Sequence, residues 1–291
     1  MNARSVVVTG ASTGIGQATA LRLADEGWTV FAGVRRAADA DRLTADAARA
    51  RGELTPILLD VTDEDQVESA FATIADTLGN RGLSALVNNA GTALGGPVEY
   101  LPLATWRDQF DVNVFGQITV TKAAMPLLRV GSDGHGGHGR IVFIGSNSGR
   151  MAAPMLGPYA ASKFAVEGLA DALRMELVGT GVSVVVIEPG AIATPIWEKG
   201  RNLADRLEED LPAEALERYA DLIAGTRAGI EMQDSSGAPP SAAADVVWRA
   251  LNAKRPATRY QVGIDGKLSV LAARFLPDRL KDYGVRKFMK L

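Results

Sequence analysis

Two kinds of hydrophobic pattern alternate along the chain. Short runs of consecutive apolar residues, rich in valine, isoleucine and leucine, are separated by longer stretches with apolar residues at the spacing of an amphipathic helix. Unbroken apolar runs are typical of strands that are buried on both faces of a parallel sheet. They predict seven strands, at Ser5–Thr9, Thr29–Val34, Thr55–Leu59, Ala85–Asn88, Arg140–Gly145, Ser183–Ile187 and Arg259–Val262.

The intervening stretches predict helices at Gly14–Glu26, Ala37–Arg51, Asp63–Leu78, Leu103–Leu128, Pro158–Val178 and Ser241–Ala253. Strand–helix repetition at this spacing indicates βαβ units with right-handed crossovers. We therefore expect an α/β protein with a Rossmann-type, doubly wound parallel sheet of about seven strands and helices on both faces, in a single domain.

Two segments break this rhythm. The run Gly131–Gly139 is glycine-rich and predicts a surface loop, whereas residues 196–240 form a long, charged and helical insertion. An insertion after the carboxyl end of a strand is well placed to cover a site, although a simple surface excursion would give the same pattern. We assign residues 1–265 to the main domain, including this insertion, and residues 266–291 to a C-terminal helical extension.

Composition excludes several kinds of chemistry. The 291 residues include no cysteine, which excludes disulfides, cysteine-ligated metals and a cysteine nucleophile. A net charge of −3 argues against nucleic-acid binding. The two histidines, His135 and His138, lie in the glycine-rich run, where we expect solvated side chains rather than metal ligands. With no signal-peptide pattern, we expect a cytoplasmic protein.

A glycine-rich turn follows the first predicted strand. Glycines at this point allow a tight turn and a close approach of a pyrophosphate to the backbone, and the next helix offers free N–H groups to it. An ordinary strand–helix turn remains the alternative. If the turn binds a dinucleotide, the binding residues are Gly10, Ser12, Thr13, Gly14, Ile15 and Gly16.

The second and third strands end in residues that suit the adenosine half of such a cofactor. No acid follows the second strand to bind a ribose hydroxyl; Arg35 and Arg36 stand there and could bind a 2′-phosphate. We therefore favour NADP(H), with NAD(H) possible, although the arginines would also suit a solvated helix start. Asp60 and Val61 could bind adenine, or Asp60 or Thr62 could cap the following helix.

Tyr159 and Lys163 lie four residues apart on one predicted helix, which puts both side chains on the same face. A nearby ammonium should lower the pKa of a tyrosine, which suits a general acid–base near neutral pH. Alone, this spacing is common among surface pairs.

Together the motifs resemble those of the short-chain dehydrogenase/reductase family. Their order matches, and Ser146 precedes Tyr159 by thirteen residues, which is the family interval. The resemblance extends from about residue 5 to about residue 265. It rests on Thr9-Gly-Ala-Ser-Thr-Gly-Ile-Gly16, Asn88-Asn-Ala-Gly91, Asn113, Ser146, Tyr159-x-x-x-Lys163 and Pro189-Gly190.

The resemblance implies a role for each of these residues. Tyr159 would exchange a proton with the substrate oxygen, Ser146 would orient that oxygen, and Lys163 would lower the pKa of Tyr159 and bind the nicotinamide ribose. Asn113 would hold a water that links Lys163 to solvent. The other cofactor-binding residues would be Asn88, Ala90, Gly91, Pro189, Gly190, Ile192 and Thr194.

Substrate class and partners are also implied. The presumed wall, formed by Met151, Ala152, Ala153, Met155, Leu156, Ile192, Ile196 and Trp197, is apolar. In the run Ile187-Glu-Pro-Gly-Ala-Ile192 and in its extended C-terminus, the chain resembles the branch of 17β-hydroxysteroid and retinol dehydrogenases. That branch tends to act on steroids, retinoids or other lipophilic carbonyl compounds. A smaller carbonyl compound is the alternative substrate.

Other classes and partners remain open. A non-catalytic nucleotide-binding sensor, or an epimerase or dehydratase, could share the fold. The family usually pairs subunits through the helices predicted at Leu103–Leu128 and Pro158–Val178, so we expect a homodimer or homotetramer. Lys267–Leu291 carries seven Lys or Arg against two acids and many apolar residues. It could be a lid, a subunit contact or, less favoured, a membrane-surface element.

Overall fold

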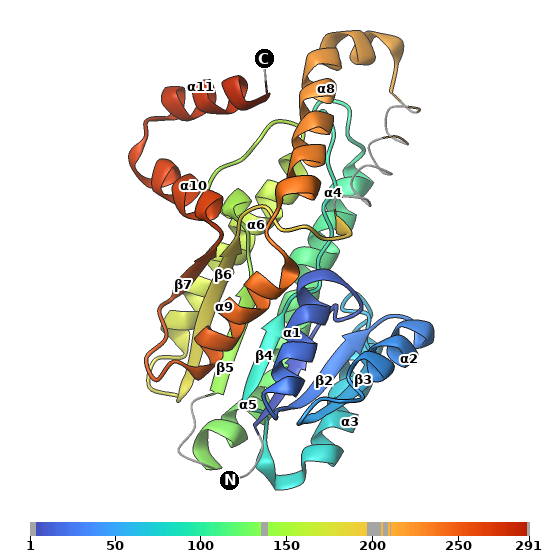
Figure 1. Cartoon of the computed structure of the whole chain (residues 1–291), viewed down its shortest axis with the longest axis vertical. Helices are drawn as coiled ribbons and strands as arrows, with labels where there is room; N and C mark the ends of the chain where they lie inside the picture. Colours follow the sequence, from blue (N-terminus) through green and yellow to red (C-terminus); the bar gives the residue numbers. More distant parts are fainter. Residues whose placement is uncertain (1–3, 135–138, 197–204, 206–208, 210, 290–291) are drawn as a thin grey trace.

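The computed structural model describes residues 4–134, 139–196, 205, 209 and 211–289. A seven-stranded parallel sheet forms its centre, in the order β3-β2-β1-β4-β5-β6-β7 (Figure 1). The predicted doubly wound sheet is therefore confirmed. The strands are β1 (Ser5–Val8), β2 (Thr29–Val34), β3 (Glu53–Leu58), β4 (Ala85–Asn88), β5 (Gly139–Ile144), β6 (Val182–Pro189) and β7 (Arg259–Val262).

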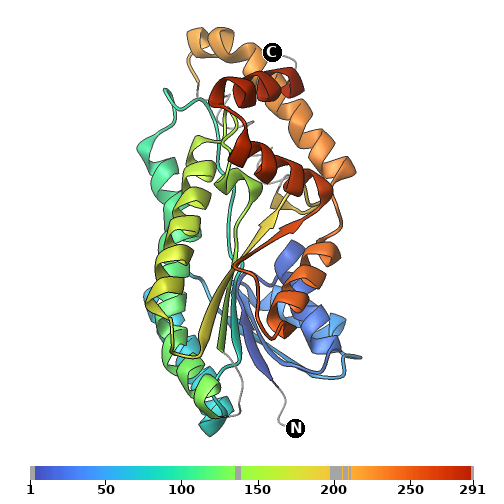
Figure 2. The same cartoon turned by 90° about the vertical axis from the view of Figure 1, so that its left-hand side faces the viewer.

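Helices cover both faces of the sheet (Figure 2). One face packs against α1 (Gly14–Asp25), α2 (Ala37–Asp46) and α9 (Pro240–Asn252). The other packs against α3 (Glu64–Leu78), α5 (Gly116–Gly134) and α6 (Gly157–Glu176).

Alternate residues of each strand enter different cores. In β1, Val6 and Val8 pack on the α1 side, whereas Val7 packs on the α3 side. In β2, Val30 and Ala32 likewise oppose Phe31. Because both faces exclude water, most positions of the central strands are apolar, which explains the long apolar runs in the sequence.

Several boundaries differ from prediction; α2, for example, ends at Asp46 rather than at Arg51. The helix predicted at Leu103–Leu128 is α4 (Leu103–Phe110), a π-helical turn (Asp111–Phe115) and α5, which continues to Gly134. The predicted loop at 131–139 is therefore wrong for its first four residues, because the helix runs on through them. His135 and His138 lie outside the described residues.

The edge strand β3 also begins at a different residue from the one predicted. It begins at Glu53 rather than Thr55, and its residues are exposed or half-buried because it pairs with β2 alone. This position tolerates Pro56, which would break a central strand.

Three further helices lie at the carboxyl end of the sheet: α8 (Ala213–Ser236), α10 (Ile264–Phe275) and α11 (Asp278–Met289) (Figures 1 and 2). The chain returning from α8 is joined to the loop after β6, where Ala238 N–H donates to Ala191 O at 2.9 Å and Ala193 N–H donates to Ala238 O at 3.0 Å. Within the described ranges, no helix has both the length and the apolar character required to cross a membrane.

Candidate active site

A cavity of about 1170 Å³ opens at the carboxyl ends of the strands. It extends from the point where β1 and β4 adjoin, which is where the strand order reverses, to α8, α10 and α11. Ligand cavities for one small molecule usually measure roughly 300–1,000 Å³, so this one has room for more than one ligand.

The glycine-rich turn forms one end of the cavity. Gly10 and Gly14 adopt φ values of +62° and +60°, a conformation that side-chain-bearing residues rarely take. Helix α1 begins at Gly14 with no side-chain cap from Thr13. The first N–H groups of α1 therefore remain open to an anion beside Ser12, Thr13 and Ile15, which line the cavity.

Gly16 and Asn88 do not line the cavity. A Cβ on Gly16 would collide with the Gly10 carbonyl oxygen and the Asn89 side chain, so this glycine allows the turn to close. Asn88 is fully buried and donates to Thr121 Oγ1 at 2.8 Å. Their predicted cofactor contacts are replaced by a supporting position behind the wall.

Sequence reasoning missed the residues that tie this turn to β4. Asn89 Nδ2 donates to Thr9 O at 2.9 Å and to Gly10 O at 3.1 Å. In return, Thr9 Oγ1 accepts from the N–H groups of Asn89 and Ala90, each at 3.0 Å. The signal was present, because Asn89 lies inside the quoted Asn88–Gly91 motif.

The two arginines after β2 have different surroundings. Arg35 is exposed, lines the cavity and forms no hydrogen bond or ion pair with another described residue. Arg36 does not line the cavity. Its guanidinium donates two hydrogen bonds to the buried carboxylate of Asp39, with N···O distances of 2.8 and 3.2 Å. Its hydrogen bonds hold the pKa of Asp39 below the usual range. Arg42, which the sequence did not single out, donates to the same carboxylate and to Ser12 O.

Asp60 and Val61 line the cavity after β3. Asp60 Oδ1 accepts from Thr62 N–H at 3.0 Å and from Thr62 Oγ1 at 2.8 Å. The capping alternative for Asp60 or Thr62 is wrong: Asp63 is the N-cap of α3, and its side chain accepts from Gln66 N–H.

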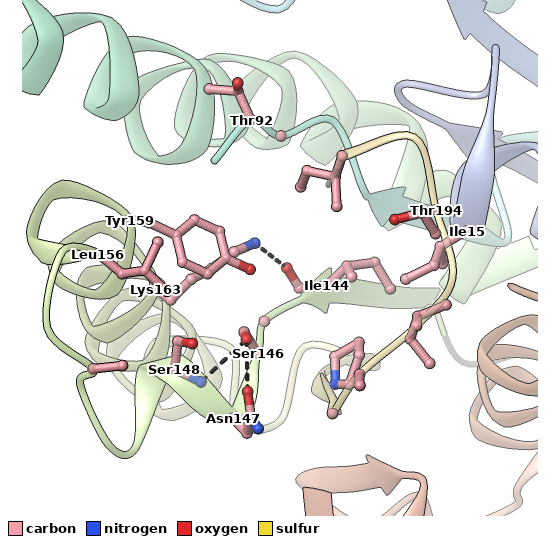
Figure 3. A pocket seen from close by; sticks show the side chains of 18 of the residues that line it. Ile15, Thr92, Ile144, Ser146, Asn147, Ser148, Leu156, Tyr159, Lys163 and Thr194 are labelled. Carbon is pink, nitrogen blue, oxygen red and sulfur yellow. Dashed lines mark hydrogen bonds between the residues drawn. The ribbon is translucent and has the colours of Figure 1, made fainter. Parts of the chain in front are cut away.

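Three polar side chains gather where β5 meets α6 (Figure 3). Tyr159 and Lys163 extend from α6, and Ser146 follows β5; all three line the cavity. Lys163 Nζ donates to Ile144 O at 2.8 Å and lies 5.7 Å from the centre of the Tyr159 ring. Ser146 Oγ accepts from Ser148 N–H at 3.1 Å and donates to Asn147 Oδ1 at 3.2 Å.

Burial dominates the protonation of this group. It raises the pKa of Tyr159 above its usual value, and the Ser146 hydroxyl offsets part of the rise. Burial also lowers the pKa of Lys163 to about 8, although the nearby Glu167 carboxylate acts to raise it. In this structure the pKa of Tyr159 is therefore raised rather than lowered, because burial outweighs any effect of the Lys163 ammonium.

Asn113 lies behind the cavity wall, fully buried in the π-helical turn. Its Nδ2 donates to Thr92 O and Ser162 Oγ, both at 3.0 Å, and its Oδ1 accepts from Thr92 N–H at 2.9 Å. Both amide hydrogens are thus occupied. These hydrogen bonds fix Thr92, which lines the cavity. That Asn113 holds a water between Lys163 and solvent stays a prediction.

Two further amides share this task, which sequence reasoning missed. Gln109 Oε1 accepts from Leu94 N–H at 2.7 Å, and its Nε2 donates to Thr92 O at 2.9 Å. Gln117 Nε2 donates to Ala90 O at 3.4 Å. Because residues 109, 113 and 117 are spaced four apart, their amides follow one side of the α4–α5 segment and hold residues 90–94. That spacing was the available signal.

The rest of the predicted wall is mostly in place. The cavity is also lined by Ala90, Gly91, Pro189, Gly190, Ile192 and Thr194 and, on the apolar side, by Met151, Ala152, Ala153, Leu156 and Ile196. Met155 is not on the wall; its φ of +65° turns the chain, and its carbonyl accepts from Gly96 N–H at 2.7 Å. Trp197 lies outside the described residues.

A partly buried ionic network lies behind the end of the cavity that holds Tyr159, Lys163 and Ser146. Arg150 donates to Glu188 at 2.6 Å and pairs with Glu167 at 2.9 Å. Arg259 from β7 pairs with Glu167 at 2.9 Å and with Asp171 at 2.8 Å. The network joins the turn after Ser146, α6, β6 and β7, which together carry most of the catalytic end.

The comparisons with known proteins agree with this geometry. A family model described as short chain dehydrogenase matches residues 4–204. NADPH-dependent 3-dehydrocapnine reductase from Ornithobacterium rhinotracheale is 37% identical and spans 99% of this chain and 98% of its own. Retinol dehydrogenase 7 from Mus musculus is 32% identical, over 95% of this chain and 86% of its own.

Among solved structures, a short-chain dehydrogenase from Streptomyces avermitilis aligns with a TM-score of 0.76 and 26% identity, over 97% of this chain and 95% of its own. The family model covers most of the chain, and the reductase relative spans nearly all of it. The chain therefore belongs to the short-chain dehydrogenase/reductase family and is an NAD(P)-dependent oxidoreductase.

Proposed function

We propose that the protein interconverts a lipophilic secondary alcohol and ketone, or an alcohol and aldehyde, with NADP(H) as cofactor and Tyr159 as the general acid–base. One observation carries the proposal: Tyr159, Ser146 and Lys163 line the same cavity as the uncapped start of α1. A proton donor and an anion site thus share one space.

The residues present fit a nicotinamide dinucleotide. The start of α1 and the glycine turn would hold the pyrophosphate, Asp60 and Val61 the adenine, and Pro189, Gly190 and Thr194 the nicotinamide end. When bound, the cofactor supplies or accepts the hydride. Lys163, whose ammonium already reaches the carboxyl end of β5, would bind the nicotinamide ribose.

In the reducing direction, Tyr159 would give its proton to the carbonyl oxygen of the substrate. The carbonyl carbon would receive the hydride that a bound NADPH would supply, which would yield the alcohol and NADP⁺. Ser146 donates a hydrogen bond to that oxygen and so fixes its position. Because burial raises the pKa of Tyr159, the phenol carries its proton near neutral pH before the transfer. The tyrosinate then regains a proton from solvent.

Two observations support NADP(H) over NAD(H). Arg35 follows β2, lines the cavity and has no acidic partner among the described residues. A 2′-phosphate of the cofactor would neutralise its charge. The reductase relative from Ornithobacterium rhinotracheale is named as NADPH-dependent.

The lipophilic substrate class rests on the far end of the cavity. Beyond Tyr159 its wall is formed by Met151, Leu156, Ile196 and Ile230, together with α10 and α11. We propose that α8, α10 and α11 cover the substrate there, which favours a bulky steroid- or retinoid-like molecule over a small carbonyl compound. The name of retinol dehydrogenase 7 is in keeping with this class.

Replacing Tyr159 by Phe tests the proposal. Loss of general acid catalysis should lower kcat roughly 10²–10⁴-fold, with NADPH affinity nearly unchanged. The measurement is NADPH oxidation with a panel of lipophilic ketones and aldehydes, alongside a fluorescence titration of cofactor binding. Tyr219→Phe is the matched control, because Tyr219 is bonded to Glu99 away from the cavity. Full activity in Tyr159→Phe would contradict the mechanism.

A further inference from the structure

Helix α10 presents an apolar stripe to solvent. Leu268, Leu271 and Phe275 follow one another at spacings of three and four residues, which places them on one face. Their exposed fractions are 62%, 56% and 67%. Exposed apolar side chains that adjoin in this way mark interaction surfaces more often than scattered ones do.

The stripe continues into the cavity. Leu276 and Leu280 are exposed in part, and both also line the cavity wall. Tyr283 on α11 adds a further exposed ring, which carries a polar hydroxyl. The outer apolar surface and the apolar interior are therefore parts of one continuous surface at the cavity mouth, and Figure 1 shows α10 and α11 standing at that end of the sheet.

Basic side chains accompany the stripe. Residues 267–287 contain six Lys or Arg against two acids, and one acid, Asp278, pairs with Lys281 at 2.7 Å. Lys267 and Arg274 are exposed on α10 itself, and the Arg274 guanidinium lies 5.4 Å from the centre of the Phe275 ring. Leucine and phenylalanine beside lysine and arginine suit the boundary between acyl chains and acidic headgroups.

We propose that α10 and α11 dock the protein onto the surface of a membrane that contains anionic phospholipid, with the cavity mouth facing the lipid. The charge distribution favours this occupant over a second copy of the chain. In a two-fold contact the same patch meets itself, so its basic side chains would face one another and repel. An anionic lipid surface instead neutralises them and accepts the apolar stripe. In this orientation a lipophilic substrate could enter the cavity directly from the lipid. That consequence rests on the proposed function, whereas the docking itself does not.

Flotation of the full chain with vesicles tests the docking without any enzyme assay. The vesicles are phosphatidylcholine alone and phosphatidylcholine mixed with phosphatidylglycerol. We expect binding to the mixed vesicles, weaker binding to phosphatidylcholine, and release at high salt, because headgroup attraction is screened. In Leu271→Glu/Phe275→Glu the affinity should fall roughly tenfold or more, since an apolar contact is replaced by repulsion.

Two comparisons make the result decisive. Val178→Glu alters an even more exposed apolar residue beyond α6 and should bind like the unaltered chain. Lys267→Glu/Arg274→Glu changes only exposed charges and should lose the preference for phosphatidylglycerol. This variant tests the docking even if Leu271→Glu/Phe275→Glu fails to fold.

Other results would overturn the proposal. These are failure of the unaltered chain to float with mixed vesicles, undiminished flotation of both patch variants, or a dimer in sedimentation velocity that Leu271→Glu/Phe275→Glu dissociates. Absence of turnover with every carbonyl compound would contradict the proposed function but leave flotation unaffected, so the two failures are distinguishable.

Discussion

We propose that a single side chain, Arg35, selects the cofactor at the turn after β2. Arg35 reaches the cavity, whereas its neighbour Arg36 is committed to Asp39. The sequence could place both arginines after the strand, but it could not separate them, since the difference depends on a carboxylate in the next helix.

Arg35→Ala should raise the KM for NADPH roughly 10–100-fold, because a charge-assisted hydrogen bond contributes about 1.5–3 kcal/mol. The KM for NADH should change little, since NADH has no 2′-phosphate. Arg36→Ala should have a much smaller effect. Steady-state kinetics with both cofactors measure this, and equal losses with NADPH and NADH would refute the assignment.

The buried amine of Lys163 makes stability depend on pH. Because its pKa falls from 10.5 to about 8 on folding, the unfolded chain binds more protons between these values, so stability rises with pH through that window. Between about pH 7.5 and about pH 9.5, the free energy of unfolding should gain roughly 2 kcal/mol from this group.

Urea denaturation at the two pH values measures this gain. Lys163→Met lacks the titrating group and should show a correspondingly smaller rise. The window stops short of the range in which Tyr159, with its raised pKa, begins to act in the opposite direction. The same rise in both proteins would show that Lys163 keeps its ordinary pKa in the folded chain.

At the scale of elements, buried ion pairs join the strands to the catalytic helix. Sequence reasoning identified Tyr159, Lys163 and Ser146, since their spacing repeats a motif, but it did not identify Arg150, Glu167, Glu188 and Arg259. Those four come from separate segments and meet only in three dimensions. The π-helical turn was not predicted for a different reason. One extra residue in a helical turn barely changes the hydrophobic periodicity of the sequence.

Arg150→Met should lower the free energy of unfolding by roughly 1–3 kcal/mol, because the fully buried Glu188 loses its 2.6 Å ion pair and, among the described residues, keeps only Arg259, at 4.0 Å, and the Gln261 amide, at 2.7 Å. Arg150→Lys should recover only part of the loss, since an ammonium cannot bridge two carboxylates as a guanidinium does. Arg218→Met, which removes an exposed pair with Glu99, should cost less than about 1 kcal/mol. Chemical denaturation compares the three, and equal losses in Arg150→Met and Arg218→Met would exclude a special role for the network.

Across the whole molecule, the cofactor end and the substrate end of the cavity have different origins. The sheet and its glycine turn form the first, and the sequence predicted them because strand periodicity and short motifs are local signals. The second depends on α8, α10 and α11, whose placement depends on contacts across the cavity mouth. For the C-terminal segment, the sequence alone could not decide between the roles of lid, subunit contact and membrane-surface element.

A chain that ends before Pro277 separates the two ends. It lacks α11, with Leu280, Gly284 and Val285 of the wall, but keeps α10, where Gly266 lies against the backbone of Gly190. The KM for a lipophilic ketone should rise roughly tenfold or more as apolar contacts are lost, while the dissociation constant for NADPH changes little. A comparable loss of NADPH affinity would show that α11 also supports the cofactor end.

The outermost strand has a consequence for the protein at high concentration. An open sheet edge can recruit a strand from another molecule and seed ordered aggregates. Along β3, Pro56 removes one backbone donor, and the exposed Glu53 places a charge at the start of the strand. This margin of the sheet therefore offers a poor template for strand addition, which favours keeping the protein dispersed during expression and storage.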